Sequence, residues 1–204
     1  MKNERLKRLV VLAMLAAISV VLVWAVHVPL IPVVSFLEYD PADVPILIAT
    51  MAYGPVAGVV LTVVVSVIQG LTVSAGSGAY GIIMHIIATS TLVLVAGTIY
   101  KFRHTRSGAV IGLVAGVLAM TFALMVFNHF ITPYFITPDW SDAAAVAANR
   151  AYVDTLLVPF IAPFNLIKAG VNSTITFLVY KVVSRYIVHG DAFASGPRKA
   201  ADQI

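Results

Sequence analysis

A lysine inside the last apolar stretch is the residue whose position most suggests a chemical role. Lys168 lies well within the apolar run from Asp154 to Arg185, and placing a lysine in the middle of a membrane span costs about 3 kcal/mol. Asn165 and Asn172 share its helical face, since they lie one turn before it and one turn after it. Such a face either bonds to neighbouring helices or binds a ligand, and we favour a binding role.

Polar residues also interrupt two earlier apolar runs. Asn128 lies near the end of its run, and a buried amide can pair with the amide or imide edge of a ligand or bond to another helix. His85 precedes Thr89 by one helical turn. This histidine could relay protons, but we expect a neutral, hydrogen-bonded imidazole.

An acidic cluster, Glu38-Tyr39-Asp40-Pro41-Ala42-Asp43, precedes another apolar run. Three neighbouring carboxylates resemble a cation site. A simpler interpretation makes Asp40 the N-cap of a helix, with Pro41 at its first position and Asp43 in its first turn. Glu38 has no such role, so we predict that it belongs to a pocket or a lid.

The elements that position these residues are predicted to be membrane helices. Apolar residues make up 60% of the 204-residue chain and charged residues only 11%. A soluble domain is about half apolar and about a quarter charged, so lipid must surround much of this chain. The basic residues lie between apolar blocks rather than along one stripe, which argues against nucleic acid as a partner.

Absent residues and motifs exclude several kinds of chemistry. The chain has no cysteine, and therefore no disulfide, thiolate nucleophile or thiolate-bound metal. It also lacks the P-loop pattern for ATP and the H-E-x-x-H and G-x-S-x-G patterns of hydrolases. We therefore predict a chain that is not an enzyme, with no catalytic residues, no metal site and no ATP-binding motif of its own.

The apolar runs predict an all-α membrane protein, a bundle of six transmembrane helices in a single domain over residues 1–189. A span needs about 20 apolar residues, and the second run is shorter because Gly54-Pro55 ends it. Pro159 and Pro163 are expected to divide the last run into a short outer segment and a span. Residues 190–204 are predicted to form a mobile cytoplasmic tail. The six spans are expected at about 7–27, 41–53, 55–72, 79–100, 108–130 and 163–185.

Charge placement orients these spans. All basic residues except Arg150 and Lys168 fall in segments on the side of the N-terminus. Basic residues collect on the cytoplasmic side, so we predict a multi-pass protein of the cell membrane with both termini in the cytoplasm. Gly108, Gly112 and Gly116, spaced four apart, predict close packing of the fifth span against a neighbouring helix.

Four short segments, taken in their order and spacing, carry a resemblance to a known family. They are Phe36-Leu37-Glu38-Tyr39-Asp40-Pro41-Ala42-Asp43-Val44-Pro45, Tyr53-Gly54-Pro55 with Gly58, Asn128 before Ile131-Thr132-Pro133, and Pro163-Phe164-Asn165-Leu166-Ile167-Lys168. Over about residues 5–188 the chain resembles the substrate-binding (S) component of an energy-coupling factor (ECF) vitamin transporter, and most of all the riboflavin-specific type.

The resemblance implies high-affinity binding and uptake of riboflavin, which is a transported ligand and not a cofactor. The implied partners are a membrane coupling protein and two cytoplasmic ATPases, in addition to the lipid bilayer. The residues expected to bind the flavin through polar groups are Glu38, Asn128, Asn165 and Lys168. The residues expected to cover its ring are Leu37, Tyr39, Met84 and Phe164. The residues expected to contact the coupling protein are Ala13 and Ala17 on the first span.

Three alternatives stay open from the sequence. An S component for thiamine or biotin would keep the architecture and change the vitamin. A small membrane enzyme would use Asp40, Asp43 and His85. A purely structural subunit would bind no ligand, so that changing Lys168 would alter no binding.

Overall fold

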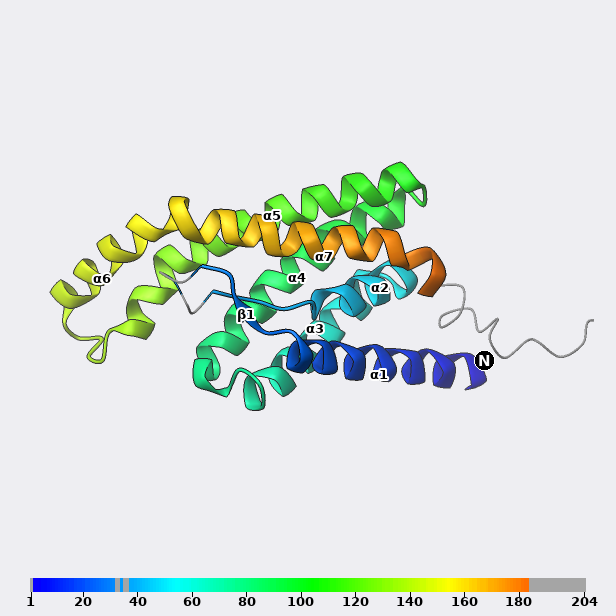
Figure 1. Cartoon of the computed structure of the whole chain (residues 1–204), viewed down its shortest axis with the longest axis horizontal. Helices are drawn as coiled ribbons and strands as arrows, with labels where there is room; N and C mark the ends of the chain where they lie inside the picture. Colours follow the sequence, from blue (N-terminus) through cyan, green and yellow to red (C-terminus); the bar gives the residue numbers. More distant parts are fainter. Residues whose placement is uncertain (1, 32–33, 35–36, 184–204) are drawn as a thin grey trace, which may run out of the picture.

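The computed structural model describes residues 2–31, 34 and 37–183, which form an elongated bundle of helices (Figure 1). The predicted tail, residues 190–204, lies outside the described residues. Helices α4 and α5 pack against each other, α3 packs on α4, and α7 contacts both α5 and α2. The elements in chain order are α1 Lys2–Ala25, β1 Val28–Pro29, β2 Glu38–Tyr39, α2 Asp43–Tyr53, α3 Pro55–Leu71, η2 Ala75–Ser77, α4 Gly78–Phe102, α5 Arg106–Ile136, α6 Ala143–Leu156, η3 Leu157–Ile161 and α7 Ala162–Val183.

The helices confirm the predicted class of membrane protein. Four stretches of the described residues are long and apolar enough to cross a membrane: α1, α4, α5 and the stretch Ala143–Val183 that ends in α7. Helices α2 and α3 are apolar but shorter. With these two, the structure is an all-α membrane bundle of six helices.

The connection between α5 and α7 contains a helix that was not predicted. Helix α5 continues to Ile136, beyond the expected end at residue 130, although Pro133 lies inside it. After a short turn, the Asp142 side chain caps α6 by accepting a hydrogen bond from the backbone N–H of Ala145 at 2.9 Å. Alanine has the highest helix propensity, so the alanine-rich segment that follows Asp142 forms a helix despite its modest hydropathy.

A π-helical turn joins α6 to α7 without breaking the rod. It covers Leu157–Ile161 and includes Pro159, and the backbone N–H of Ala162 bonds to the carbonyl of Leu157. Proline has no N–H to donate, and a π-helical turn is a common way for a helix to absorb such a defect. Pro159 therefore marks a change of helical winding rather than the predicted division into separate segments.

A two-strand pairing and a sharp turn flank α2. Strands β1 and β2 pair antiparallel, with Val28 opposite Tyr39, so the segment between α1 and α2 folds back along the bundle. Helix α2 ends at Gly54, whose φ of 92° favours glycine, and Pro55 opens α3 directly after it. This Gly-Pro turn makes α2 short, as the sequence predicted.

Glycines bring α4 and α5 together. A Cβ atom on Gly112 would lie 2.8 Å from the carbonyl oxygen of Ala96, and one on Gly116 would lie 2.9 Å from that of Leu92. The predicted close packing against a neighbouring helix is therefore confirmed for Gly112 and Gly116. Gly108 instead packs against Arg103 in the connection between α4 and α5.

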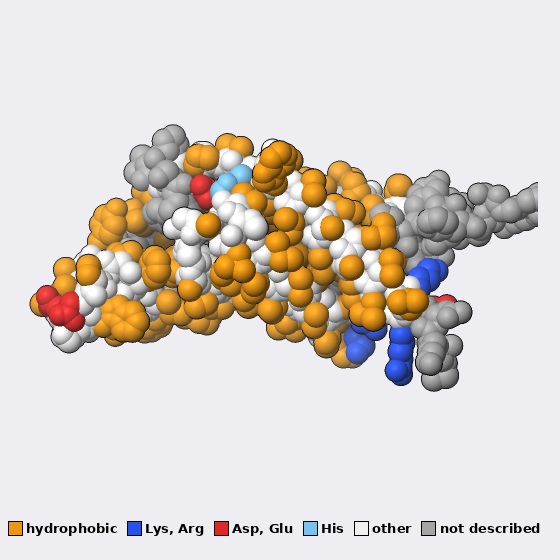
Figure 2. Space-filling model, turned by 90° about the horizontal axis from the view of Figure 1, so that it is seen from below, with side chains coloured by type: hydrophobic (Ala, Val, Ile, Leu, Met, Phe, Trp, Pro, Cys, Tyr) orange, Lys and Arg blue, Asp and Glu red, His pale blue; other side chains and the backbone are white. Residues whose placement is uncertain are grey.

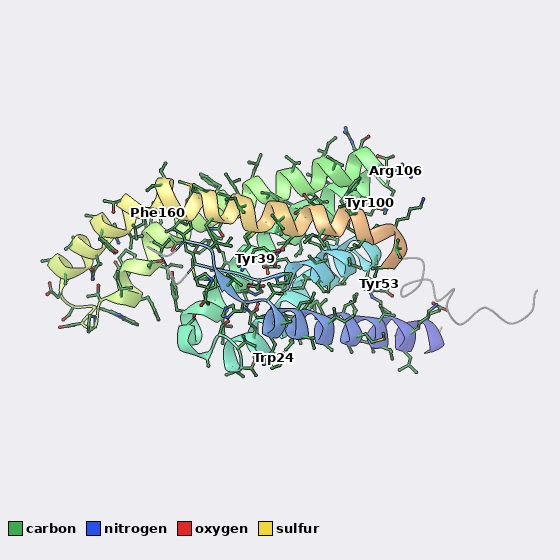
Figure 3. All side chains as sticks on the ribbon, viewed as in Figure 1. Trp24, Tyr39, Tyr53, Tyr100, Arg106 and Phe160 are labelled. Carbon is green, nitrogen blue, oxygen red and sulfur yellow. The ribbon has the colours of Figure 1, made fainter. Side chains whose placement is uncertain are left out.

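Charge is distributed unevenly along the long axis. The face shown in Figure 2 is largely hydrophobic, and its Lys and Arg side chains gather at one end. Acidic side chains are visible at the opposite end, beside a histidine partway along the molecule, and in a small area near the basic side chains. Figure 3 shows Tyr53, Tyr100 and Arg106 toward the basic end, which is also the end where α1 begins. The bundle thus has one basic end, and the candidate site described next lies away from it.

Candidate ligand-binding site

A cavity of about 450 Å³ lies among α3, α4, α5, α7 and strand β2, near the connection between α3 and α4. Its volume falls within the range of about 300–1,000 Å³ that is usual for sites of small organic ligands. Most of the surface that lines it is apolar, and a few polar groups converge on it. The predicted residues that line the cavity are Leu37, Glu38, Met84, Asn128, Phe164, Asn165 and Lys168.

Lys168 reaches the cavity while paired with a buried carboxylate. Its Nζ donates to Asp40 Oδ2 at 2.7 Å and to the carbonyl oxygen of Glu38 at 3.2 Å. Asp40 is only 2% exposed and Lys168 only 8%, so the charge of the lysine is balanced inside the protein. An ammonium group has three N–H donors, which leaves one for a ligand.

Asp40 was predicted to cap α2, and the structure corrects this. The helix begins at Asp43 with Ala42 at the cap position and no side-chain cap. The Asp40 carboxylate accepts from the backbone N–H of Ala42 at 3.0 Å and from Lys168. Burial alone would raise the pKa of Asp40, but Lys168, His85 and these hydrogen bonds together hold that pKa below its ordinary value.

Asp43 lies in the first turn of α2, as predicted, and links three helices. Its carboxylate accepts from Thr89 Oγ1 on α4 at 2.7 Å and from Asn172 Nδ2 on α7 at 3.2 Å. His85 Nε2 lies 3.8 Å from Asp43, and Ser66 Oγ lies 2.7 Å from His85 Nδ1. Because Asp43 is fully buried, this network fixes the floor of the cavity.

The two asparagines expose part of their hydrogen-bonding capacity to the cavity. Asn128 Nδ2 donates to the carbonyl of Leu124 at 2.8 Å, and Asn165 Nδ2 donates to that of Ile161 at 2.8 Å. An amide nitrogen carries two N–H groups, so each asparagine keeps one to offer a ligand. Asn128 Oδ1 also accepts from Thr132 at 3.0 Å, which holds its side chain in place.

Aromatic and aliphatic side chains form the remaining walls. Tyr80 and Phe135 stack with their ring centroids 4.2 Å apart and 17° between their planes. Both line the cavity, as do Met84 and Phe164. Flat apolar surfaces of this kind suit a planar ring.

Tyr39 lies beside the cavity but is not among the residues that line it. Its hydroxyl donates to Asn172 Oδ1 at 3.0 Å, on the same face of α7 as Lys168. Figure 3 shows Tyr39 in the middle of the bundle. Tyr39 therefore contacts the polar face of α7 without lining the cavity, and its contact with a ligand stays a prediction.

A contact between a histidine and a glutamate borders the cavity. His27 Nε2 lies 2.7 Å from Glu38 Oε2, and both side chains are partly exposed. Both residues line the cavity, and Glu38 belongs to the short β1–β2 pairing. The Glu38 side chain therefore lies where the β1–β2 pairing borders the cavity.

Sequence reasoning missed two polar lining residues, Tyr80 on α4 and Thr132 on α5, whose hydroxyl oxygens lie 2.7 Å apart. Tyrosine and threonine are ordinary near span ends, so only the spacing of Thr132 one turn after Asn128 could have indicated a shared face. Gln69 on α3 also lines the cavity, and its amide oxygen is buried without a hydrogen-bond partner among the described residues.

Ala13 and Ala17, which were predicted to contact a coupling protein, do not line this cavity. Both are exposed on α1, whereas the neighbouring Ala16 is buried. Small exposed side chains four residues apart leave a shallow strip that another helix could approach closely. No described residue packs over this strip in the isolated chain.

A membrane bundle of six helices with a mostly apolar cavity, on which a few polar side chains converge, has the architecture expected of a membrane protein that binds a small ligand. A sequence profile described as "ECF transporter, substrate-specific component" matches residues 7–180. The chain belongs to this family, whose members are substrate-binding membrane subunits of transporters and not enzymes.

Individual relatives agree with this assignment. The chain is 30% identical to the riboflavin transporter RibU of Staphylococcus aureus, with 89% of this chain and 92% of the relative covered. It is 29% identical to the riboflavin transporter FmnP of Bacillus subtilis, with 86% and 91% covered. A solved structure titled "Structure and mechanism of the S component of a bacterial ECF transporter" matches with a TM-score of 0.72 at 29% identity, covering 91% of this chain and 98% of that one.

Proposed function

We propose that this chain binds riboflavin and serves as the substrate-specific subunit for its uptake through an ECF transporter. The observation that carries the proposal is the cavity whose polar residues, Asn128, Asn165 and Lys168, converge from α5 and α7. The names of the relatives support riboflavin over thiamine or biotin.

The chemistry of riboflavin fits this arrangement. Its planar ring is mostly apolar and ends in a dione edge that both donates and accepts hydrogen bonds. Asn128 and Asn165 can donate to and accept from that edge, and the third N–H of Lys168 can donate to a carbonyl or hydroxyl. We assign contacts with the ring to Leu37, Met84 and Phe164, and we place Glu38 at the border of the site.

The charge balance disfavours a phosphorylated flavin. Lys168 is the one lysine or arginine among the described residues that line the cavity, and Asp40 already pairs with it. A phosphate group would enter without a free cation to meet it. We therefore expect FMN to bind more weakly than riboflavin.

The partners and the orientation belong to the same proposal. We place both termini in the cytoplasm, because the basic end of the bundle contains the start of α1 and the connection between α4 and α5. The proposed partners are a membrane coupling protein, contacted at Ala13 and Ala17, and two cytoplasmic ATPases that supply the energy.

A fluorescence titration tests the proposal. Purified protein should quench riboflavin fluorescence at a one-to-one ratio, because the ring would lie against Tyr80 and Phe164. Thiamine and biotin, added in excess, should not restore the fluorescence. Restoration by either vitamin, or no quenching by protein that is monodisperse and folded, would contradict the assignment.

A further inference from the structure

A second cavity, of about 440 Å³, lies at the basic end of the bundle, away from the proposed riboflavin site. It is bordered by α1, by the turn between α2 and α3, and by the end of α4. The basic residues that line it are Arg8, Lys101 and His104, and the lining contains no aspartate or glutamate. The lining residues therefore carry a net positive charge, and the acidic residue that acts on them, Glu4, lies outside the lining near Tyr53.

Arg8 is held in place by the end of α2. Its guanidinium donates to the carbonyl oxygen of Tyr53 at 3.3 Å and lies 5.3 Å from the centre of the Tyr53 ring. A guanidinium has five N–H donors, so most remain available. A cation that is fixed by a carbonyl and an aromatic face loses less freedom when it binds an anion.

Donors in the last turn of α4 and just after this helix line the same cavity. Tyr100 and His104 contact each other edge to face, with ring centroids 5.0 Å apart. Lys101 is exposed and lies between them in sequence. Together these side chains offer an ammonium, an imidazole N–H and a hydroxyl to one anion.

The ends of the neighbouring helices contribute little to the positive electrostatic potential in this cavity. Helix α3 begins at the cavity, but α2 and α4 end there. The positive end of one helix dipole is therefore offset by the negative ends of two others. The basic side chains, and not the helix ends, account for the preference for an anion.

Apart from Thr50, the rest of the lining is largely apolar, and part of it borders the lipid-facing surface. Met51, Ala52, Pro55 and Val56 line the cavity, and Val56 is 72% exposed. A basic rim beside an apolar, membrane-facing wall matches a phosphate that carries an acyl chain better than a free phosphate ion.

We propose that this cavity binds the headgroup phosphate of an anionic phospholipid from the surrounding leaflet. Arg8 and Lys101 would bind the phosphate, and the acyl chains would run along the exposed side of α3. Such a lipid would tie α1 to the turn between α2 and α3. The proposal is independent of what the first cavity binds.

Lipid retention by the purified full chain tests the proposal. The protein, in neutral detergent, is given equal amounts of phosphatidylglycerol and phosphatidylcholine, and bound lipid is counted by native mass spectrometry. Phosphatidylglycerol should be retained preferentially. Lys101→Gln should weaken its binding about fivefold, and Arg8→Gln with Lys101→Gln about 20-fold.

A matched control separates this cavity from general attraction to a basic surface. Arg103→Gln with Arg106→Gln removes the same charge from the same end, at residues that do not line the cavity. This pair should leave retention unchanged. Equal losses in both double variants, or equal retention of the two lipids by the unmodified protein, would overturn the proposal.

Two further outcomes identify a different occupant. Inorganic phosphate that displaces phosphatidylglycerol would show a soluble anion site and refute the lipid assignment. Unchanged lipid retention in the Arg8 and Lys101 double variant, combined with failure to assemble with a coupling protein, would assign the cavity to protein docking. Because Lys101 is exposed, the single variant remains informative if the double variant does not fold.

Discussion

Lys168 has two tasks, one in the fold and one in the proposed binding of riboflavin. It neutralises Asp40 through a 2.7 Å contact and it also lines the cavity. Removing one partner of a buried ion pair typically costs about 3–5 kcal/mol, whereas replacing both can be nearly neutral. Stability and binding should therefore respond differently to single and double changes.

Lys168→Met should lower the thermal unfolding temperature and abolish measurable riboflavin quenching. Adding Asp40→Asn should restore most of the unfolding temperature, because no unpaired charge is then buried, but it should not restore quenching. Thermal melts and titrations on the two variants check this. Recovery of both properties in the double variant would mean that Lys168 has no direct contact with the ligand.

Asn128→Leu should weaken riboflavin binding by about 10-fold or more, because a buried hydrogen bond to the ligand is lost and its partner is left unsatisfied. Asn149→Leu is the matched control, since Asn149 bonds to Thr137 Oγ1 at 2.9 Å and does not line the cavity. Equal affinity of the two variants, measured by fluorescence titration, would remove Asn128 from the site.

The candidate site could be predicted where a polar residue lies inside an apolar helix. Lys168, Asn165 and Asn128 are costly inside apolar helices, so their presence already indicated a role. The partner of Lys168 was not predictable, because Asp40 also satisfies the sequence rules for a helix cap. Only the folded position of β2 beside α7 shows that Asp40 forms an ion pair instead.

At the scale of helices, close approach between α4 and α5 sets the width of the bundle. Gly112→Ala would place a Cβ atom 2.8 Å from the carbonyl of Ala96, and such overpacking typically costs about 1–3 kcal/mol. We expect a lower unfolding temperature for this variant. Gly170→Ala, where a Cβ would meet nothing within 4 Å, should melt at or above the temperature of the unmodified protein.

Helix positions were predictable from apolar runs, but helix ends were not. Spans are predicted from apolar runs, and these runs indicated α1 to α5 and α7. Helix α6 was overlooked because it is rich in alanine and its hydropathy is modest. It also stopped α5 too early and interpreted Pro159 as a break. A proline removes one hydrogen bond, and neighbouring turns can absorb that loss.

The exposed strip on α1 is expected to contact the coupling protein. Ala13→Trp and Ala17→Trp should each reduce co-purification with the coupling protein, because a bulky ring prevents close helix approach, and should leave riboflavin quenching intact. Ile18→Trp, on another exposed part of α1, should leave both unchanged. Normal assembly of the two alanine variants would place the contact elsewhere.

At the scale of the whole molecule, the proposed orientation places the basic end in the cytoplasm. The chain has no cysteine, so single cysteines can report sidedness without background. Ser141→Cys, before α6, should react with an impermeant maleimide in intact cells. Ser107→Cys, at the start of α5, should react only after permeabilisation. The opposite pattern would invert the topology.

The identity of the ligand is the central claim, and the small molecule carried by the protein tests it most directly. The protein is purified from cells supplied with riboflavin and denatured, and the released molecules are identified and counted by mass spectrometry. We predict about one riboflavin per chain. Release of a different vitamin at that ratio, or of no flavin at all, would contradict the assignment.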